Sequence, residues 1–396
     1  TAYEISLGLV GSEMCIRDRF RYLLERRGVP LYLPLHERIA LVLAALASRI
    51  VPEWIMSAVT AKMMHESRKV VLRGEPGFLD RHIAKRGQMG ARLNLNILGE
   101  AILGEEEASC RLVENVKRLE SSECDYISVK ISSIFSQVSV LAFEDTLEKV
   151  KEPLRTLYRA AQGNPVRGRS KFVNLDMEEY RDLHLTCRAF MEVLSEDEFF
   201  DLEAGIVLQA YLPDSFELQK SLTKWASLRR SRGGGRIKLR IVKGANLAME
   251  KVEAAAHGWE QAPYGCKNEV DANFKRMLHY ACEKKRAHAV RVGVGSHNLF
   301  DVSYALLLRE REDVRGEVEI EMLEGMANHQ ARAVEKAGGS LLFYAPVVLR
   351  ENFHSAIAYL VRRLDENTAP QNFLHDLFGM RLGCLLYTSP SPRDRG

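Results

Sequence analysis

The hydrophobic pattern of the chain changes near residue 90. Up to that point, apolar residues recur at helical spacing in two segments, 33–51 and 53–72, and a Gly/Pro-rich break follows at 73–78. This pattern predicts a small all-helical segment over residues 20–90. Beyond it, short runs rich in β-branched and other apolar residues predict strands.

The strand-like runs recur eight times, and helical patterns separate them. The predicted strands are 91–98, 126–132, 172–176, 205–211, 237–243, 289–295, 318–325 and 341–346. Among the helical segments are 105–122, 143–162, 215–232, 271–287 and 353–367. Eight strand–helix units over about 275 residues match a (β/α)8 TIM-type barrel over 91–367, since such barrels have about 250 residues. An open doubly wound sheet is the alternative, because eight strands could also lie flat.

The segment 236–242 alternates charged and apolar residues along one predicted strand. In a barrel, the outward face of a strand packs on helices and is apolar, whereas inward residues near the carboxyl ends line the site. Ile237, Leu239 and Ile241 are therefore predicted to face the helices. Arg236, Lys238 and Arg240 are then predicted to face the barrel axis, where each cation must meet a partner.

Other predicted strands carry polar or aromatic residues at the same end. These residues are Glu100, Lys130, Asp176, Gln209, His297, Asn298 and Tyr344. Because the carboxyl ends of parallel strands meet at one rim, this pattern predicts a binding or catalytic site in the barrel mouth. A ring of salt bridges that only fills the mouth is the alternative.

The last helical segment has an unusual polar face. Its apolar stripe consists of Ile357, Leu360, Val361 and Leu364, and the opposite face carries Tyr359, Arg362, Arg363 and Glu366. A solvated face is the ordinary interpretation of such a pattern. An arginine pair beside a tyrosine can also bind a small carboxylate through fork-shaped, charge-assisted hydrogen bonds.

Composition and charge exclude few function classes. Hydrophobic residues make up 46% of the 396 residues, and the net charge of +3 with 28% charged residues gives no sign of a nucleic-acid partner. The longest apolar stretch, 39–51, is shorter than the roughly 20 residues that cross a bilayer. The seven cysteines show no metal-binding spacing and predict free thiols, so we expect the cytoplasm or the cytoplasmic surface of a membrane.

Both ends of the chain look foreign to it. The segments 9–18 and 384–394 share no residues in register, yet one DNA element read on opposite strands can encode both. That element resembles a transposase-type sequencing adapter. We therefore expect residues 1–19 and 384–396 to be technical read-through, Cys15 and Cys384 to be non-native, and residues 368–383 to lead toward a missing C-terminal domain.

Several segments together resemble one family. They are "LNILGEAILG", "YISVKISSI", "FVNLDMEEYRDL", "AGIVLQAYLPDS", "LRIVKGANLAMEKVEAAAHGWEQAPY", "VDANFKRML", "VGSHNLFD", "YAPV" and "AIAYLVRRLDEN". With these segments the chain resembles the proline dehydrogenase domain of the bacterial proline utilization A proteins. The resemblance implies a distorted (β/α)8 barrel that binds FAD, oxidises L-proline to Δ1-pyrroline-5-carboxylate and passes electrons to membrane quinone. It also implies an aldehyde dehydrogenase domain in a full-length parent and a transient contact with the membrane surface.

The resemblance implies roles for particular residues. Those expected to bind the substrate are Lys130, Asp176, Leu323, Tyr344, Tyr359, Arg362 and Arg363, and all of these except Leu323, together with Arg240, form the expected catalytic set. Those expected to hold FAD are Gln209, Arg240, Val242, Lys243, Gly244, Ala245, Lys267, His297, Asn298 and Glu366. No G-x-G-x-x-G motif is present, so the barrel itself would hold the cofactor. No metal is expected.

Two other functions fit the bare pattern. One is an aldolase-type barrel in which Lys130 forms a Schiff base with a carbonyl substrate. The other is a non-catalytic barrel that serves assembly and binds no small molecule at its rim.

Overall fold

The computed structural model describes most of the chain between residues 35 and 363. The described residues are 35–47, 61, 65, 67, 68, 70–98, 102, 104–165, 170–326, 328–338, 341–352, 356, 357, 359, 360 and 363. The segments predicted as technical read-through and as a linker lie outside this part, and so do Glu100, Arg362 and Glu366.

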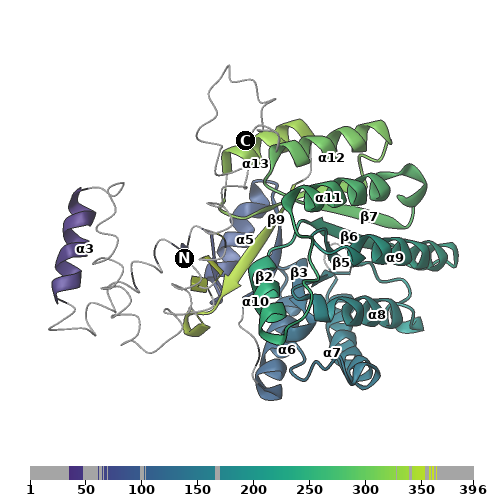
Figure 1. The fold of residues 1–396 in the computed structure, drawn as a ribbon, viewed down its shortest axis with the longest axis horizontal. Helices are drawn as coiled ribbons and strands as arrows, with labels where there is room; N and C mark the ends of the chain where they lie inside the picture. Colours follow the sequence, from purple (N-terminus) through teal and green to yellow (C-terminus); the bar gives the residue numbers. More distant parts are fainter. Residues whose placement is uncertain are drawn as a thin grey trace.

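Eight parallel strands form a closed barrel (Figure 1). They are β2 (Arg92–Ile97), β3 (Tyr126–Lys130), β4 (Phe172–Asp176), β5 (Ala204–Gln209), β6 (Ile237–Val242), β7 (Val290–Gly295), β8 (Val318–Leu323) and β9 (Leu341–Val348). Strand β9 pairs with β8 on one side and with β2 on the other, which closes the sheet. All eight predicted strands are confirmed. The open doubly wound sheet is wrong, because in a flat sheet β9 could not pair with both β8 and β2 at its two ends.

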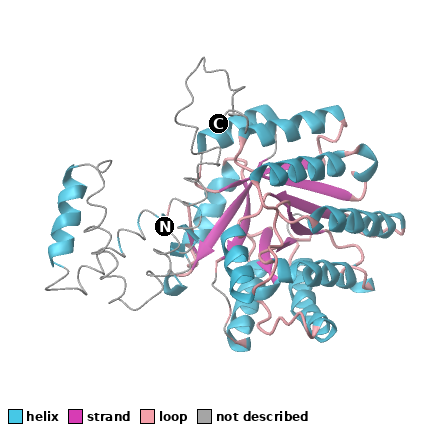
Figure 2. Ribbon diagram, viewed as in Figure 1, coloured by secondary structure: helices cyan, strands magenta, loops and turns pink. Residues whose placement is uncertain are grey.

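Helices surround the strands on the outside (Figure 2). The described α-helices are α3 (Leu35–Ala47), α5 (Phe78–Gln88), α6 (Glu105–Glu120), α7 (Phe143–Gly163), α8 (Leu183–Val193), α9 (Asp214–Ser231), α10 (Leu247–His257), α11 (Lys267–Cys282), α12 (Leu299–Arg311) and α13 (Asn328–Gly338). Short 3-10 helices are η1 (Ile131–Ser133), η2 (Tyr180–Asp182), η3 (Asp197–Phe199), η4 (Lys284–Arg286) and η5 (Arg350–Asn352). The alternation of strand and helix is that of a TIM-type barrel.

The N-terminal segment is helical in α3 and α5, but it also contributes a strand. Strand β1 (Leu72–Arg73) adds to β9 in parallel, with Leu72 opposite Val347. The prediction of helix through residue 72 is therefore wrong at its end, because Leu72 gains backbone partners and burial at the sheet edge. Helix α5 packs outside β9 and β2, with the Arg86 guanidinium 4.5 Å from the centre of the Phe343 ring (Figure 1).

Strand β6 follows the predicted parity. Ile237, Leu239 and Ile241 are at most 1% exposed and belong to the core between barrel and helices. Each such side chain contributes about 1.5 to 3 kcal/mol when it is fully buried, so a one-residue register slip would be costly. This outward packing forces Lys238 and Arg240 toward the axis.

Candidate active site

Two cations from β6 and two carboxylates from β8 meet inside the barrel. Lys238 Nζ lies 2.7 Å from Glu319 Oε2 and 2.6 Å from Glu321 Oε1. Arg240 Nε lies 2.8 Å from Glu321 Oε2, and the Glu321 side chain is 0% exposed. The predicted inward direction of Lys238 and Arg240 is therefore confirmed. Below the mouth, the salt-bridge alternative also describes the molecule well, because the cations are paired within the chain.

Lys238, Arg240, Glu319 and Glu321 form a charged column inside the barrel, and strand β7 leaves room for it. An added Cβ at Gly293 would lie 2.2 Å from Glu321 Oε1 and 2.8 Å from Lys238 Cε. Any side chain at this inward position would displace the ion pair. Glycine at 293 is thus a packing requirement of Lys238 and Glu321.

A hydrogen-bonded cluster forms around Asp176 at the end of β4. Its Oδ2 accepts hydrogen bonds from Tyr344 Oη at 2.7 Å and Asn96 Nδ2 at 2.9 Å. Its Oδ1 accepts one from Asn174 Nδ2 at 2.9 Å and lies 3.5 Å from Arg240 Nη1. Asn96 also donates to the Tyr344 hydroxyl. Four neighbours thus fix the Asp176 carboxylate in one orientation.

Arg240 connects this cluster to the column below it. Its guanidinium carbon lies 4.6 Å from the centre of the Tyr344 ring, which suits a cation–π contact. Burial by itself lowers the pKa of Arg240, but Glu321 and then Asp176 reverse that effect and raise it. Burial and the Asp176 charge raise the pKa of Tyr344 well above its usual value. Arg240 therefore stays protonated, and Tyr344 keeps its proton as a hydrogen-bond donor.

The described residues of the last helical segment pack at the barrel mouth. Ala356 and Ile357 are 0% and 6% exposed and cluster with Leu98 and Val348 at the ends of β2 and β9. Tyr359, on the predicted polar face, is 7% exposed, so the solvated interpretation of this face is wrong there.

Arg363 lies in the same region. Its guanidinium carbon is 5.2 Å from the centre of the Tyr359 ring. The Arg363 charge also contributes to lowering the pKa of His297. Tyr359 and Arg363 are therefore in contact, and His297 lies within range of the Arg363 charge.

His297 and Gln209 present buried polar atoms that have no hydrogen-bond partner among the described residues. The Leu323 backbone N–H donates to His297 Nε2 at 2.9 Å, which assigns the ring proton to Nδ1. Burial, and next the Arg363 charge, lower the pKa of His297 to about 4, so the ring is neutral. His297 Nδ1 and Gln209 Oε1 both lack a partner. They offer one donor and one acceptor at the ends of β7 and β5.

The lysines expected to hold the cofactor are engaged within the chain. Lys243 Nζ lies 2.5 Å from Asp271 Oδ1 and 2.7 Å from Asp301 Oδ2, and Lys267 pairs with the same Asp271. Asn298 caps α12, because its Oδ1 accepts the Phe300 backbone N–H at 2.9 Å. These residues lie on the rim as predicted, but each already has an internal partner.

The turn after β6 places three further predicted residues. Val242 ends the strand on its inward face, and an added Cβ at Gly295 would lie 2.8 Å from its Cγ1. Gly244 and Ala245 are exposed. Gly244 has φ of 117°, and a Cβ there would lie 2.0 Å from the Tyr211 ring. The close approach of Tyr211 and the positive φ therefore both require glycine at 244.

Lys130 is also at the rim, where its Nζ lies 2.7 Å from Glu178 Oε1. A Schiff-base lysine must lose its proton before it attacks a carbonyl. The Lys130 amine is already engaged in an ion pair with Glu178, so this geometry does not favour the aldolase alternative.

Sequence reasoning missed several residues of the site. They are Asn96, Asn174, Glu178, Glu319 and Glu321. The signal was present for three of them, because "RLNLNI" in β2 and "VEIEML" in β8 alternate in the same way as β6. Leu323, which was predicted, ends that alternation in β8.

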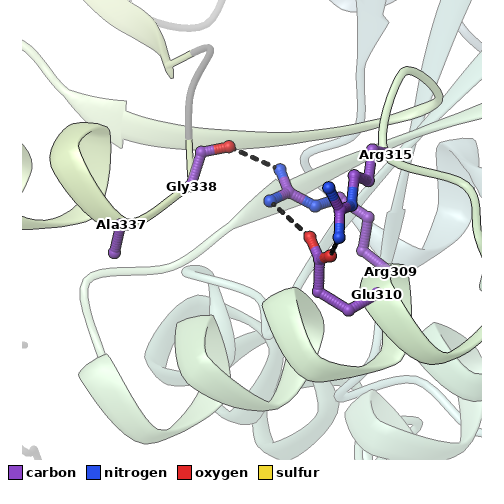
Figure 3. A pocket seen from close by; sticks show the side chains of 5 residues that line it. All are labelled: Arg309, Glu310, Arg315, Ala337 and Gly338. Atoms are coloured by element: carbon purple, nitrogen blue, oxygen red, sulfur yellow. Dashed lines mark hydrogen bonds and ion pairs between the residues drawn. The ribbon is translucent and has the colours of Figure 1, made fainter.

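A cavity of about 440 Å³ lies away from this site (Figure 3). It is lined by Arg309, Glu310, Arg315, Ala337 and Gly338, which precede β8 and β9 in the chain. It therefore lies toward the amino-terminal ends of these strands. Arg309 donates to the Gly338 carbonyl at 2.7 Å, and Arg309 and Arg315 both pair with Glu310. Most of its polar groups pair with one another, and of the lining residues only Arg309 has a buried side-chain atom, Nε, without a hydrogen-bond partner in the described part of the chain, so we assign the cavity no chemistry.

The described part of the chain holds neither a membrane-spanning helix nor a metal-binding cluster. No described helix is both long enough and apolar enough to cross a membrane. No group of three or more His, Cys, Asp or Glu side chains there could hold a metal ion. The cysteines at 110, 124, 187, 266 and 282 are free thiols, as predicted.

Comparisons with known proteins agree with one another. The family model described as "Proline dehydrogenase" matches residues 79–376. A solved structure of proline utilization A from Corynebacterium freiburgense is 44% identical with a TM-score of 0.73, and the match covers 85% of this chain and 34% of that one. The structure from Bdellovibrio bacteriovorus, inactivated by N-propargylglycine, is 29% identical with a TM-score of 0.76, covering 93% and 38%.

A curated relative gives the same picture at lower identity. The bifunctional protein PutA of Salmonella typhimurium is 26% identical over 312 residues, which cover 74% of this chain. The chain spans only 22% of the length of that relative.

Proposed function

Since the chain belongs to the proline dehydrogenase family, we propose that its barrel oxidises L-proline to Δ1-pyrroline-5-carboxylate with FAD as the hydride acceptor. The observation that carries this proposal is the position of Arg240. This cation is held inside the barrel by Glu321 and Asp176, and it contacts Tyr344 beside the mouth where Tyr359 and Arg363 lie.

The mouth suits a flavin. His297 Nδ1 is a buried donor and Gln209 Oε1 a buried acceptor, and neither has a partner among the described residues. A flavin ring edge carries both hydrogen-bond donors and acceptors, so it could satisfy the two atoms. Arg240 supplies the positive charge that favours a reduced, negatively charged cofactor. When bound, FAD would accept the hydride that leaves a ring carbon of proline.

The remaining residues would bind and orient the substrate. Arg363, with the neighbouring Arg362, is expected to hold the proline carboxylate, because a bidentate contact fixes orientation as well as position. Lys130, Asp176, Tyr344, Tyr359 and Leu323 are expected to form the pocket. The Bdellovibrio relative is inactivated by N-propargylglycine, which like proline combines a carboxylate with a secondary amine. A pocket of this kind in the present chain would select the same two groups.

The wider role remains part of the proposal. We expect quinone to accept the electrons, a transient contact with the cytoplasmic membrane surface, and an aldehyde dehydrogenase domain in a longer parent protein. Lys243 and Lys267 would contribute to cofactor binding only if the cofactor replaced Asp271 and Asp301 as the ion-pair partners of these two lysines.

An anaerobic titration tests the reaction directly. The 396-residue chain, loaded with FAD, should lose its flavin absorbance on addition of L-proline. Charged hydrogen bonds contribute about 1.5 to 3 kcal/mol each, so Arg363→Met should weaken the response to proline by about tenfold or more. It should still bind the flavin and unfold at a similar denaturant concentration.

A matched control is available at the other end of the barrel. Arg315 is 73% exposed in the cavity away from the mouth, and Arg315→Met should leave the response unchanged. The proposal fails if the loaded, folded wild-type chain does not bleach with proline.

A further inference from the structure

We propose that Glu321 positions Arg240 and that its negative charge sets the reduction potential of the bound flavin. This inference rests on the proposed function and concerns a residue that neither the motifs nor the expected site residues include. It assigns to a residue of β8, deeper in the barrel than Arg240, an effect on the reduction potential of the cofactor.

The geometry makes Glu321 the principal partner of Arg240. The Glu321 side chain is 0% exposed, and its Oε2 lies 2.8 Å from Arg240 Nε. The contact from Asp176 to Arg240 is longer, at 3.5 Å, and Asp176 already accepts three hydrogen bonds from Asn96, Asn174 and Tyr344. Glu321 therefore forms the closer ion pair, on the Nε side of the guanidinium, whereas Nη1 donates to Asp176 at the end of β4.

Glu321 is itself held in place from below. Its other oxygen, Oε1, lies 2.6 Å from Lys238 Nζ, so the carboxylate is fixed at both ends. Gly293 on β7 leaves the space that this arrangement occupies. A carboxylate in this position cannot turn away from Arg240 without also giving up its contact with Lys238.

The electrostatic consequence has a definite sign. A cation beside the flavin favours the reduced form, and a carboxylate 2.8 Å from that cation offsets part of its field. Burial keeps solvent from screening either charge. Glu321 is therefore expected to lower the flavin potential, and its neutralisation should raise the potential.

Glu319 provides a matched control on the same strand. It lies two residues earlier and also points inward, pairing with Lys238 at 2.7 Å and with Arg92 at 3.1 Å. Its contacts do not include Arg240. Glu319→Gln and Glu321→Gln thus remove the same charge from the same column, one layer apart.

The experiment measures the midpoint potential of the bound flavin without proline. We expect Glu321→Gln to raise the equilibrium ratio of reduced to oxidised flavin by about tenfold, which corresponds to about 30 mV for a two-electron couple. Glu319→Gln should shift the potential by less than a third as much. Glu321→Asp, which keeps the charge, should remain near the wild-type value.

Loss of Glu321 leaves two buried cations with fewer partners, so the single variant could unfold. The double variant Lys238→Met/Glu321→Gln removes the deeper cation together with the carboxylate and keeps the local charge balanced. Its potential should still rise, because the group removed beside Arg240 is closer to the mouth than the group removed below. This variant decides the outcome if Glu321→Gln does not fold.

The possible results separate this inference from the proposed function. Flavin that bleaches with proline in the wild type, but has equal potentials in Glu321→Gln and Glu319→Gln, overturns the role of Glu321 alone. A lower potential in Glu321→Gln or in the double variant also overturns it. A wild-type chain that binds no flavin overturns both proposals.

Discussion

Arg229 and Arg240 are both shielded from solvent, yet their surroundings differ. Arg229, on α9, is 3% exposed and donates only to backbone carbonyls, those of Leu194, Phe199, Leu202 and Gly235. These carbonyls surround the amino-terminal ends of β5 and β6. Arg240, at the opposite end of the barrel, has a side chain that is 12% exposed and is paired with two carboxylates.

The difference appears in the proton affinity of the two groups. Burial lowers the pKa of Arg229 to about 10, because neutral carbonyl dipoles compensate the charge only in part. Glu321 and Asp176 more than offset the same effect of burial at Arg240 and raise its pKa. Four backbone carbonyls hold Arg229 as a structural clamp. The partners of Arg240 are side-chain carboxylates, which can be replaced by substitution one at a time. The electrostatic surroundings of Arg240 can therefore be altered in single steps.

The largest expected effect comes from breaking the clamp. Arg229→Met removes the donor from four carbonyls and should lower the free energy of unfolding by about 3 to 5 kcal/mol, because a buried acceptor left without its partner costs about 1 to 3 kcal/mol. Urea denaturation measures this change. The exposed neighbour Arg230 is the control, and Arg230→Met should change stability by no more than about 0.5 kcal/mol. Equal effects of the two substitutions would contradict the clamp.

A smaller loss of stability is expected at Arg240. Arg240→Met leaves Glu321 with Lys238 as its remaining ion-pair partner and should cost about 3 kcal/mol, with loss of bleaching by proline. Glu321→Gln in the same chain removes the carboxylate charge that has lost Arg240 and should restore at least about 1 kcal/mol. A double-mutant cycle in urea measures this coupling. Additive costs would show that Arg240 and Glu321 do not depend on each other.

The two arginines also differ in how far the sequence reveals them. Alternation along β6 predicts the inward direction of Arg240, because a strand repeats every two residues and its apolar face must meet the helices. No such period predicts Arg229, since its partners are backbone carbonyls whose convergence depends on the closed barrel. The partners of Arg240 were missed for a different reason. Glu321 stands in an alternating strand, but only the order of the strands in the barrel places β8 one strand beyond β7, within reach of β6.

For residues at the rim of the barrel, too, the sequence predicts the position of a side chain but not its partner. Asp176 and Tyr344 were predicted from their positions at strand ends, and the structure brings them to 2.7 Å of each other. The reason for Gly244 could not be predicted, because the Tyr211 ring that requires it comes from the end of β5. Strand period thus predicts the direction of a side chain, whereas its partner depends on the tertiary register.

The smallest expected effect is a pH dependence at the mouth that the clamp should lack, since carbonyls do not titrate. Burial and the Arg363 charge lower the pKa of His297 to about 4, whereas an unfolded histidine titrates near 6.5. Between pH 6.5 and about pH 4, His297 is protonated in the unfolded chain but neutral in the native protein. The free energy of unfolding therefore decreases as the pH is lowered through this range. The loss should reach about 1.4 kcal/mol at pH 5.5.

Urea denaturation between pH 7 and pH 5.5 measures this loss by comparing His297→Gln with the wild type at each pH. The comparison is needed because burial raises the pKa of Glu179 to about 7 and that of Asp182 to about 6, which changes stability in the opposite direction over this range. His297→Gln should lose the acid-induced decrease, whereas the exposed His288→Gln should keep it. An unchanged slope in His297→Gln would mean that the mouth, like the clamp at Arg229, does not titrate in this range.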